Sequence, residues 1–447
     1  MAQTKTDFSK GSVKRLILSQ AIPLTLAQAV QLLYNIVDRI YIGHLDQIGD
    51  LALTGLGITF PVIILIAGFT SLYATGGATL FAIARGRGEE AEAENILGNV
   101  FALLVGTAGI LTIFCYCFRR PILFAFGASV QSYAYADAYL KIYLIGTLFS
   151  MLSTGLNPYI NAQGFPKIGM LTTVIGAVSN ILLDPVFIFA LDMGVQGAAL
   201  ATVISQGISA VWVLRFLTGD RAILKLRKSR IRIARDRTEG ILALGLPGFV
   251  VQGTNSLVSI VCNNQLQLYG GDLYVGIMTI LSSVREMVSL PVMGISQGSQ
   301  PVMGFNYGAK EYGRVKQCIR FTALLGTLYT LAAWATVMFI PRQLIGIFSS
   351  EAETVAIGAK MLNIYFFGFF FMSFQFAGQS TFQALGRAKQ AIFFSLLRKA
   401  FIVVPLTLLL PGLGLGVEGV FWAEPISNAL GGLAAFTTMY LTVYRKL

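Results

Sequence analysis

The most reactive residue types in this sequence are polar side chains set inside apolar stretches. Gln28, Gln31, Asn35 and Asp38 recur at intervals of three, four and three residues, so they share one stripe of a helix. A carboxylate on such a stripe needs water, a cation or a proton. Arg39 is the nearest base, but adjacent helical residues point about 100° apart, so we do not expect a direct pair.

A second polar group follows near residue 180. Asn180 and Asp184 are one helical turn apart, and Pro185 deprives the carbonyl of Ile181 of its helical donor. The next apolar segment adds a face of hydroxyl groups: Thr202, Ser205 and Ser209. These oxygens suit a hard cation such as Na⁺ and can also hold a proton. We therefore predict a coupling-ion site, with a satisfied helix–helix contact as the alternative, at Asp38, Asn180, Asp184 and Thr202.

The second half of the chain has polar stripes without acids. One stripe holds Gln252, Asn255, Ser259 and Asn263, and another holds Gln375, Gln379 and Gln383. Such amides either join helices or line a cavity. The candidate cavity residues are Gln31, Asn35, Asn157, Gln252, Asn255, Gln375 and Gln379. We interpret the other intramembrane charges as ion pairs within one half or as side chains that reach the interface: Arg285, Glu286, Arg398, Lys399 and Glu424.

The composition indicates what must position these residues. Of 447 residues, 55% are hydrophobic and only 12% are charged, whereas soluble domains carry about 25% charged residues. This excludes an ordinary soluble enzyme. Apolar runs long enough to cross a bilayer predict twelve spans, near 14–43, 50–84, 91–118, 131–159, 166–190, 195–217, 241–268, 272–305, 317–340, 354–385, 388–410 and 417–444.

Motifs for catalysis are not found in the sequence. There is no GxxxxGK[ST] phosphate loop and no HExxH zinc motif. His44 is the single histidine, and the four cysteines have no CxxC spacing. We therefore expect neither an enzyme nor an ATP-driven pump, and no cofactor beyond the coupling ion.

The net charge is +12, and the positions of the basic residues show what this excess means. Basic residues gather before the first span, between the sixth and seventh spans, and in the loops on that same side. By the positive-inside rule this side is cytoplasmic, as are both termini. The excess of positive charge therefore gives no reason to expect a nucleic-acid partner. We divide the chain into a first lobe (1–217), a cytoplasmic connector (218–240) and a second lobe (241–447).

The two lobes repeat one another. Residues 194–205 match 416–427, and 162–167 match 384–389, both at an offset of 222. Offsets of 224 and 220 place Pro23 on Pro247 and Gly88 on Gly308. Six spans per copy make the copies parallel. The fold class we expect is an all-α membrane protein, in which an axis along the membrane normal relates two six-helix bundles.

Four motifs give the chain a family resemblance: Asn35-Ile-Val-Asp38, Asn161-Ala-Gln-Gly164-Phe-Pro166, Asn180-Ile-Leu-Leu-Asp184-Pro185 and Gln300-Pro301 through Gly304-Phe305-Asn306-Tyr307-Gly308. With these motifs the sequence resembles the multidrug and toxic compound extrusion (MATE) family over essentially its whole length. The resemblance implies a first-lobe cation site at Asp38, Asn180, Asp184 and Thr202, with Tyr139 nearby. Some members place acids in spans seven and ten, but here those stripes carry none.

The resemblance implies a multidrug antiporter in the cell membrane. It would work by alternating access, exchanging H⁺ or Na⁺ for small organic compounds that are often cationic. We expect a monomer whose other partners are membrane lipids. The alternative is a flippase for lipid-linked precursors, which would need basic groups in its cleft.

Overall fold

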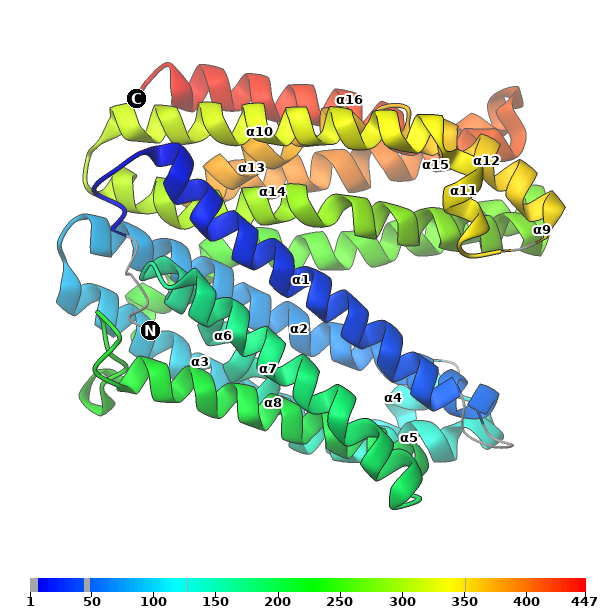
Figure 1. Ribbon diagram of the computed structural model, residues 1–447, viewed down its shortest axis with the longest axis horizontal. Coiled ribbons are helices and arrows are strands. Elements are labelled where there is room, and N and C mark those ends of the chain that lie inside the picture. The colour runs from blue at the N-terminus through cyan, green and yellow to red at the C-terminus, as the bar shows by residue number, and fades with distance from the viewer. Residues whose placement is uncertain (1–6, 44–48, 127, 350) are drawn as a thin grey trace. The chain divides into compact units, whose positions relative to one another are not determined.

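The computed structural model describes residues 7–43, 49–126, 128–349 and 351–447. All the regular secondary structure of the described residues is helical, with no β-strand (Figure 1). This follows from the long apolar runs, because a helix satisfies every backbone polar group within its own segment, as a bilayer requires. The chain is an all-α, multi-pass membrane protein.

The number of spans agrees with the prediction. Within the described residues, ten helices are long and apolar enough to cross a membrane, and an eleventh span is the pair Ser132–Ile145 and Thr147–Ala162, bent by 56°. The longest of the ten, Ala388–Tyr444, covers 57 residues and contains Gly414 and Gly416, both with positive φ. It therefore holds two spans, which gives twelve.

The chain divides into two compact units. Unit 1 contains Leu26–Gly245 and unit 2 contains Phe8–Thr25 with Leu246–Leu447. The helices that lie wholly in unit 1 are α2 (Gly49–Gly86), α3 (Glu90–Cys117), α4 (Arg119–Ala125), α5 (Val130–Ile145), α6 (Thr147–Ala162), α7 (Pro166–Pro185), the π-helix η1 (Val186–Ala190), α8 (Gly194–Thr218) and the 3₁₀ turn η2 (Lys228–Arg230).

Unit 2 contains the later helices. They are α10 (Tyr312–Phe339), α11 (Pro341–Gly346), α12 (Ala352–Phe366), η3 (Phe369–Phe371), α13 (Met372–Ala384), α14 (Ala388–Leu396), η4 (Leu397–Val403), α15 (Val404–Leu410), η5 (Pro411–Leu415), α16 (Gly416–Met439) and η6 (Tyr440–Tyr444). Two hydrophobic clusters form their core, and one of them includes Phe8, Val13 and Ile17 from the start of the chain.

Two helices pass from one unit into the other. Helix α1 (Val13–Gly43) starts in unit 2 and ends in unit 1, while α9 (Arg235–Gly308) starts in unit 1 and ends in unit 2. Glycines let the starts of α1 and α9 pack closely against the units that receive them. A Cβ on Gly76 would lie 2.0 Å from the carbonyl oxygen of Ile241, and one on Gly298 would lie 2.7 Å from the backbone nitrogen of Ala21. The first turns of each half thus pack in the unit formed by the other half.

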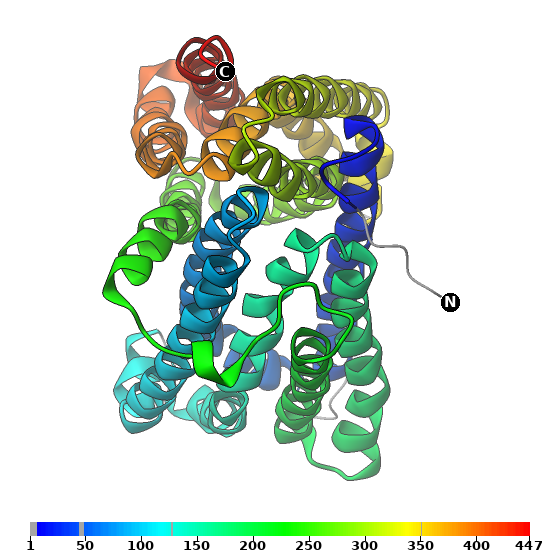
Figure 2. The same cartoon turned by 90° about the vertical axis from the view of Figure 1, so that its left-hand side faces the viewer.

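The connector between α8 and α9 is held against unit 1. Figure 2 shows this segment, Gly219–Ala234, running from the end of α8 to the start of α9. Arg227 forms an ion pair with Glu94 at 2.9 Å, and Arg237 at the start of α9 makes two hydrogen bonds to Glu92, of 2.7 and 2.8 Å. These acids lie in the first turns of α3, where a helix N-terminus favours negative charge.

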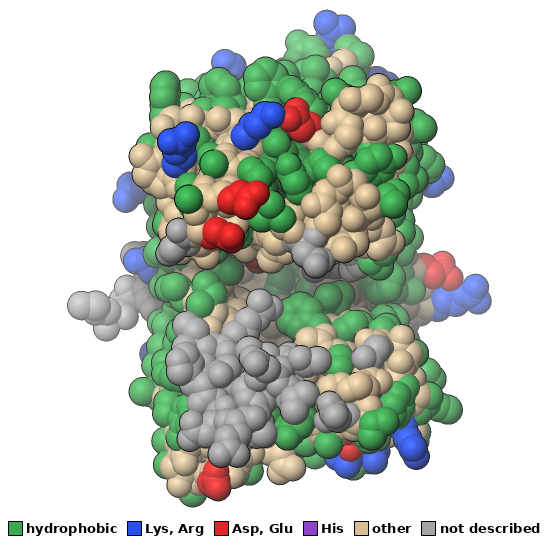
Figure 3. Space-filling model, turned by 90° about the vertical axis from the view of Figure 1, so that its right-hand side faces the viewer, with side chains coloured by type: hydrophobic (Ala, Val, Ile, Leu, Met, Phe, Trp, Pro, Cys, Tyr) green, Lys and Arg blue, Asp and Glu red, His purple; other side chains and the backbone are tan. Residues whose placement is uncertain are grey.

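The surface carries few charges. Figure 3 looks onto the ends of the helices, where a few Lys, Arg, Asp and Glu residues lie scattered among hydrophobic and other side chains. The flanks of the helices, which face sideways in that view, carry the large exposed apolar residues. Large exposed residues include Ile110 and Ile113 on α3, which are 69% and 67% exposed. In a soluble protein such a surface would be costly, but here it matches the hydrocarbon of a bilayer.

Candidate functional site

The polar stripe of α1 lies in the part of this helix that belongs to unit 1. Gln31 donates from Nε2 to Oδ1 of Asn35 over 3.3 Å, and both side chains are exposed. Asp38, one turn further on, is only 9% exposed. The stripe therefore runs from accessible amides to a nearly buried carboxyl group.

Helices α7 and α8 supply the second half of the predicted ion site. Asn180 donates from Nδ2 to Oδ1 of Asp184 over 3.2 Å and to Oγ1 of Thr202 over 3.3 Å. All three residues are buried, at 1%, 0% and 3% exposure. One amide thus joins the acid of α7 to the hydroxyl group of α8.

Several oxygen atoms around this amide still have acceptor capacity. Oδ1 of Asn180 and Oδ2 of Asp184 are buried and have no hydrogen-bond partner among the described residues. Oγ of Ser205, one turn after Thr202, is likewise buried without a hydrogen-bond partner among the described residues. Because buried polar atoms are nearly always satisfied by protein or by ordered water, these oxygens have the capacity to accept from water or a bound proton, or to ligate a hard cation.

Pro185 shapes the end of α7 as the sequence predicts. The proline has no N–H, so the carbonyl of Ile181 lacks its helical donor. The chain continues as the π-helix η1, where the amide of Leu191 bonds to the carbonyl of Val186, five residues back. A widened turn therefore begins two residues after Asp184, and such π-turns are common at functional sites.

A cavity of about 440 Å³ lies inside unit 1. Most of the predicted ion-site residues line it, namely Asp38, Asn180, Thr202 and Tyr139, together with three of the predicted cavity residues, Gln31, Asn35 and Asn157. Asp184 is not among the lining residues and is linked to the cavity by its bond from Asn180. The volume is within the usual range for small-molecule sites.

Sequence reasoning missed part of the lining. Tyr34, Tyr143 and Gln206 also face the cavity. Two of them had a signal, because Tyr34 is four residues before Asp38 and Gln206 four residues after Thr202, on the same helical faces. The ring of Tyr143 stacks on Tyr139, with centroids 5.9 Å apart and planes 16° apart.

The predicted cavity residues of the second half all belong to unit 2. Asn255 is exposed on α9, and the side chain of Gln252 lies outside those described. Gln375 and Gln379 bond to helix α14, Gln375 to the carbonyl of Phe394 at 3.4 Å and Gln379 to Oγ of Ser395 at 2.7 Å. These two amides therefore act as interhelical contacts, one of the two interpretations that the sequence leaves open.

Comparison with known proteins identifies the chain. The MatE family model matches it twice, over residues 23–186 and 247–409, in keeping with the internal repeat. Multidrug export protein MepA of Staphylococcus saprophyticus is 25% identical over 436 residues, covering 97% of this chain and 95% of that protein. The protein of the same name from Staphylococcus aureus strain MSSA476 is 24% identical over 437 residues, with the same coverage.

Solved structures share the fold. An outward-facing multidrug resistance MATE transporter of the MOP superfamily superposes with a TM-score of 0.92, at 22% identity and over 100% of both chains. A MATE protein in complex with MaL6 superposes with a TM-score of 0.93, also at 22% identity and full coverage. The family model covers well over half of the sequence, so the chain belongs to the MATE family of membrane transporters.

Proposed function

We propose that this protein is a secondary antiporter that exports organic compounds in exchange for Na⁺ or H⁺. The observation that carries the proposal is the unit 1 cavity, where Asp38, Asn180 and Thr202 meet and where Asp184 is one hydrogen bond away. The names of the two relatives, both multidrug export proteins, favour export over the flippase alternative.

The ion acts on oxygen atoms that are already close together. An ion or proton held by Asp38 and Asp184 would engage the open acceptors of Asn180 and Asp184 and so stabilise the packing of α7 against α8. Asp38 is on α1, which continues into unit 2. Ion binding can therefore favour one conformation of the transporter while the drug favours another, which is all that coupling requires.

The membrane topology is part of the proposal. The basic loops favour a cytoplasmic position for both termini, and we expect a monomer in the cell membrane. Fusing a reporter that fluoresces only in the cytoplasm to either terminus tests this. A dark but correctly inserted fusion would contradict the orientation.

Transport by purified protein in proteoliposomes tests the exchange. A fluorescent organic cation is loaded, and either a Na⁺ gradient at fixed pH or a pH gradient without Na⁺ is imposed. We expect one of these gradients to drive transport and Asp38→Asn to reduce it to the level of protein-free liposomes. Asp220→Asn, which alters a fully exposed connector carboxylate, is the matched control. Wild-type rates in Asp38→Asn would overturn the coupling role.

A further inference from the structure

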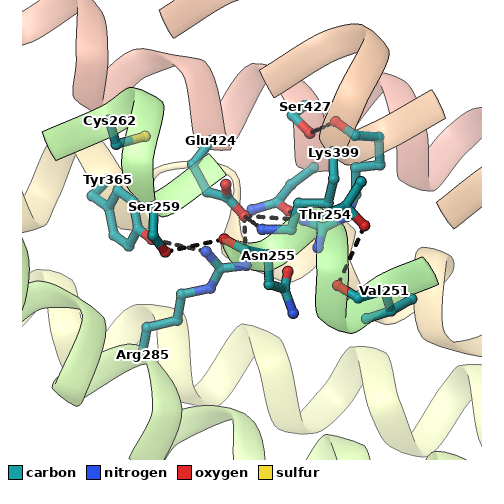
Figure 4. A network of polar contacts seen from close by, with 12 residues as sticks. Val251, Thr254, Asn255, Ser259, Cys262, Arg285, Tyr365, Lys399, Glu424 and Ser427 are labelled. Carbon is teal, nitrogen blue, oxygen red and sulfur yellow. Dashed lines mark hydrogen bonds and ion pairs between the residues drawn. The ribbon is translucent and has the colours of Figure 1, made fainter. Parts of the chain in front are cut away.

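Unit 2 contains a buried cluster of charged side chains that the proposed ion exchange does not use. Figure 4 shows Arg285 of α9 and Lys399 of η4 directed toward Glu424 of α16. Arg285 Nη2 lies 2.5 Å from Oε1 of Glu424, Arg398 Nη1 lies 3.0 Å away and Lys399 Nζ 3.5 Å away. We call these four residues the basic cluster. As the sequence suggested, they form ion pairs within one half of the chain.

The cluster is buried within membrane-spanning helices. Glu424 is 4% exposed and Lys399 is 9% exposed, and the side chains of Arg285 and Arg398 are 18% and 13% exposed. All four positions fall within the apolar spans Leu273–Gly308 and Ala388–Tyr444. The charges are therefore largely removed from water.

The charges in the cluster do not balance. Three cations share a single carboxylate oxygen, Oε1 of Glu424. Neutral groups take some of the remaining donors, since Arg285 donates to the hydroxyl group of Tyr365 at 2.8 Å and Arg398 to Oδ1 of Asn428 at 2.7 Å. Within the described part of the chain, no second carboxylate pairs with any of the three, and Glu286 is exposed. With all groups ionised, the cluster carries two excess positive charges.

Lys399 is the least satisfied of the three cations. Its contact with Glu424 is at the limit of hydrogen-bond length, and the oxygen it approaches already accepts from two guanidinium groups. An ammonium group has three donors. A buried cation with donors to spare is costly inside a membrane and by default marks a functional site.

The internal repeat relates the cluster to the cavity of unit 1. At the offset of 222, Glu424 corresponds to Thr202, Lys399 to Ala177 and Arg398 to Gly176, and all three unit 1 residues line that cavity. The same offset pairs the neighbours of the cluster with further lining residues: Tyr365 with Tyr143, Ser427 with Ser205 and Asn428 with Gln206. Lys399 and Arg398 therefore occupy positions whose counterparts line the cavity of the other half.

We propose that the basic cluster binds an oxyanion, the carboxylate, sulfonate or phosphate group of an amphiphilic compound. Two guanidinium groups and an ammonium group are the side chains that hold such groups most strongly, because their bonds are charge-assisted. The inference rests on the proposed export function and names a substrate class for it. Anionic or zwitterionic compounds bind at the cluster, in addition to the cations suited to an acidic cavity.

A pair of probes that differ in one charge tests the proposal. Dansylglycine carries a carboxylate, and its primary amide is a neutral molecule of the same shape. We expect the full-length protein in uncharged detergent to bind dansylglycine at least 10-fold more tightly than the amide, measured by dansyl fluorescence. Equal affinities for the two probes would overturn the proposal.

Variants of Lys399 test whether the preference for the carboxylate arises at the basic cluster. Lys399→Met should abolish the preference for the carboxylate, and Lys399→Arg should keep it, which separates charge from folding. Lys360→Met is the matched control, since Lys360 pairs with Glu418 at an exposed position of the same unit. Retention of the full preference by Lys399→Met, with thermal unfolding unchanged, would also overturn the proposal.

A lipid headgroup could supply the same oxyanion, so a second arm identifies the source. Phosphatidylglycerol is titrated against bound dansylglycine, with phosphatidylcholine as the zwitterionic reference. Displacement by phosphatidylglycerol that depends on Lys399 would assign the site to lipid phosphate, and the absence of displacement would assign it to the transported compound. The assay uses no ion gradient, so failure of coupled transport would leave its result unaffected. Loss of the charge preference would likewise leave ion-coupled export unaffected.

Discussion

Unit 1 and unit 2 differ in where their buried charges lie and in the sign that predominates: two acids at the cavity of unit 1, and three bases with one acid in unit 2. In unit 1 the carboxyl group of Asp38 lines a cavity and that of Asp184 lies next to it. At the offsets of 224 and 222 the second half has Cys262 and Leu406 instead, while Glu424 replaces the neutral Thr202. The repeat thus keeps the helices but places charged residues where the other half has neutral ones.

The two acids also differ in their surroundings. Oδ2 of Asp184 is buried without a hydrogen-bond donor among the described residues, whereas Oε1 of Glu424 receives three cations. An acid with open acceptor capacity can take up and release a cation. An acid held by three bases is part of the framework that keeps those bases in place. We therefore expect the acids of the two units to have different roles.

Removing the acid of unit 2 should have the largest effect on stability. Glu424→Gln leaves three buried cations without an anion, and breaking such a pair costs about 3–5 kcal/mol. We expect a large drop in the thermal unfolding temperature of the purified protein. Glu286→Gln, an exposed acid on α9, is the control and should unfold within about 0.5 kcal/mol of wild type. If the two variants were equally stable, Glu424 would not be the group that balances the cluster.

Removing Asp184 from unit 1 should abolish transport and have little effect on stability. Asp184→Asn keeps an acceptor for Asn180 but loses the ionisable group. Gradient-driven transport in proteoliposomes should fall to background while the unfolding temperature stays close to that of wild type. A variant that is strongly destabilised and yet transports would make Asp184 a structural acid, and the distinction between the units would fail.

The hydroxyl group of Thr202 should contribute a smaller amount. Thr202→Ala removes an oxygen that accepts from Asn180, worth about 1–1.5 kcal/mol. We therefore expect the ion concentration for half-maximal transport to rise roughly 10-fold. Thr202→Ser keeps the oxygen and should behave like wild type. Unchanged ion dependence in the alanine variant would exclude Thr202 from the ion site.

The smallest effect is expected for the amides of α13. Gln379→Leu loses the bond to Ser395, which should lower the free energy of unfolding by about 1 kcal/mol. Transport should not change, because this amide joins two helices. A double-mutant cycle with Ser395→Ala measures the pair directly. A change in substrate affinity without a change in stability would instead make Gln379 a cavity residue.

Local patterns predicted much of the fold and several of the residues that line the unit 1 cavity. Helical spacing and span length gave the twelve spans, and the residues predicted on α1, α7 and α8 meet at one cavity. Part of the aromatic lining was missed. Tyr139 was named from the family resemblance and Tyr34 had a signal in its spacing to Asp38, but no such spacing to an acid pointed to Tyr143. Whether a tyrosine like Tyr143 faces lipid or a cavity depends on tertiary packing.

The basic cluster shows where such patterns stop being informative. Arg285 and Glu424 are 139 positions apart in the chain, and no local spacing indicates that they meet. The pairing was expected only in general terms, since intramembrane charges seldom remain single. Its imbalance, with three bases on one acid, depends on how α9, η4 and α16 pack.

The exchanged helix ends bear on how the two halves can differ in charge. Neither half of the chain forms a complete unit by itself. The start of α1 packs in unit 2, and the start of α9 packs in unit 1. Two separate copies of one half with this arrangement would have to exchange their first helical turns, as in a domain-swapped dimer. In the present chain both halves belong to one polypeptide, so the exchanged segments are always supplied together. The two halves can therefore differ in charge without either losing the segment that it receives.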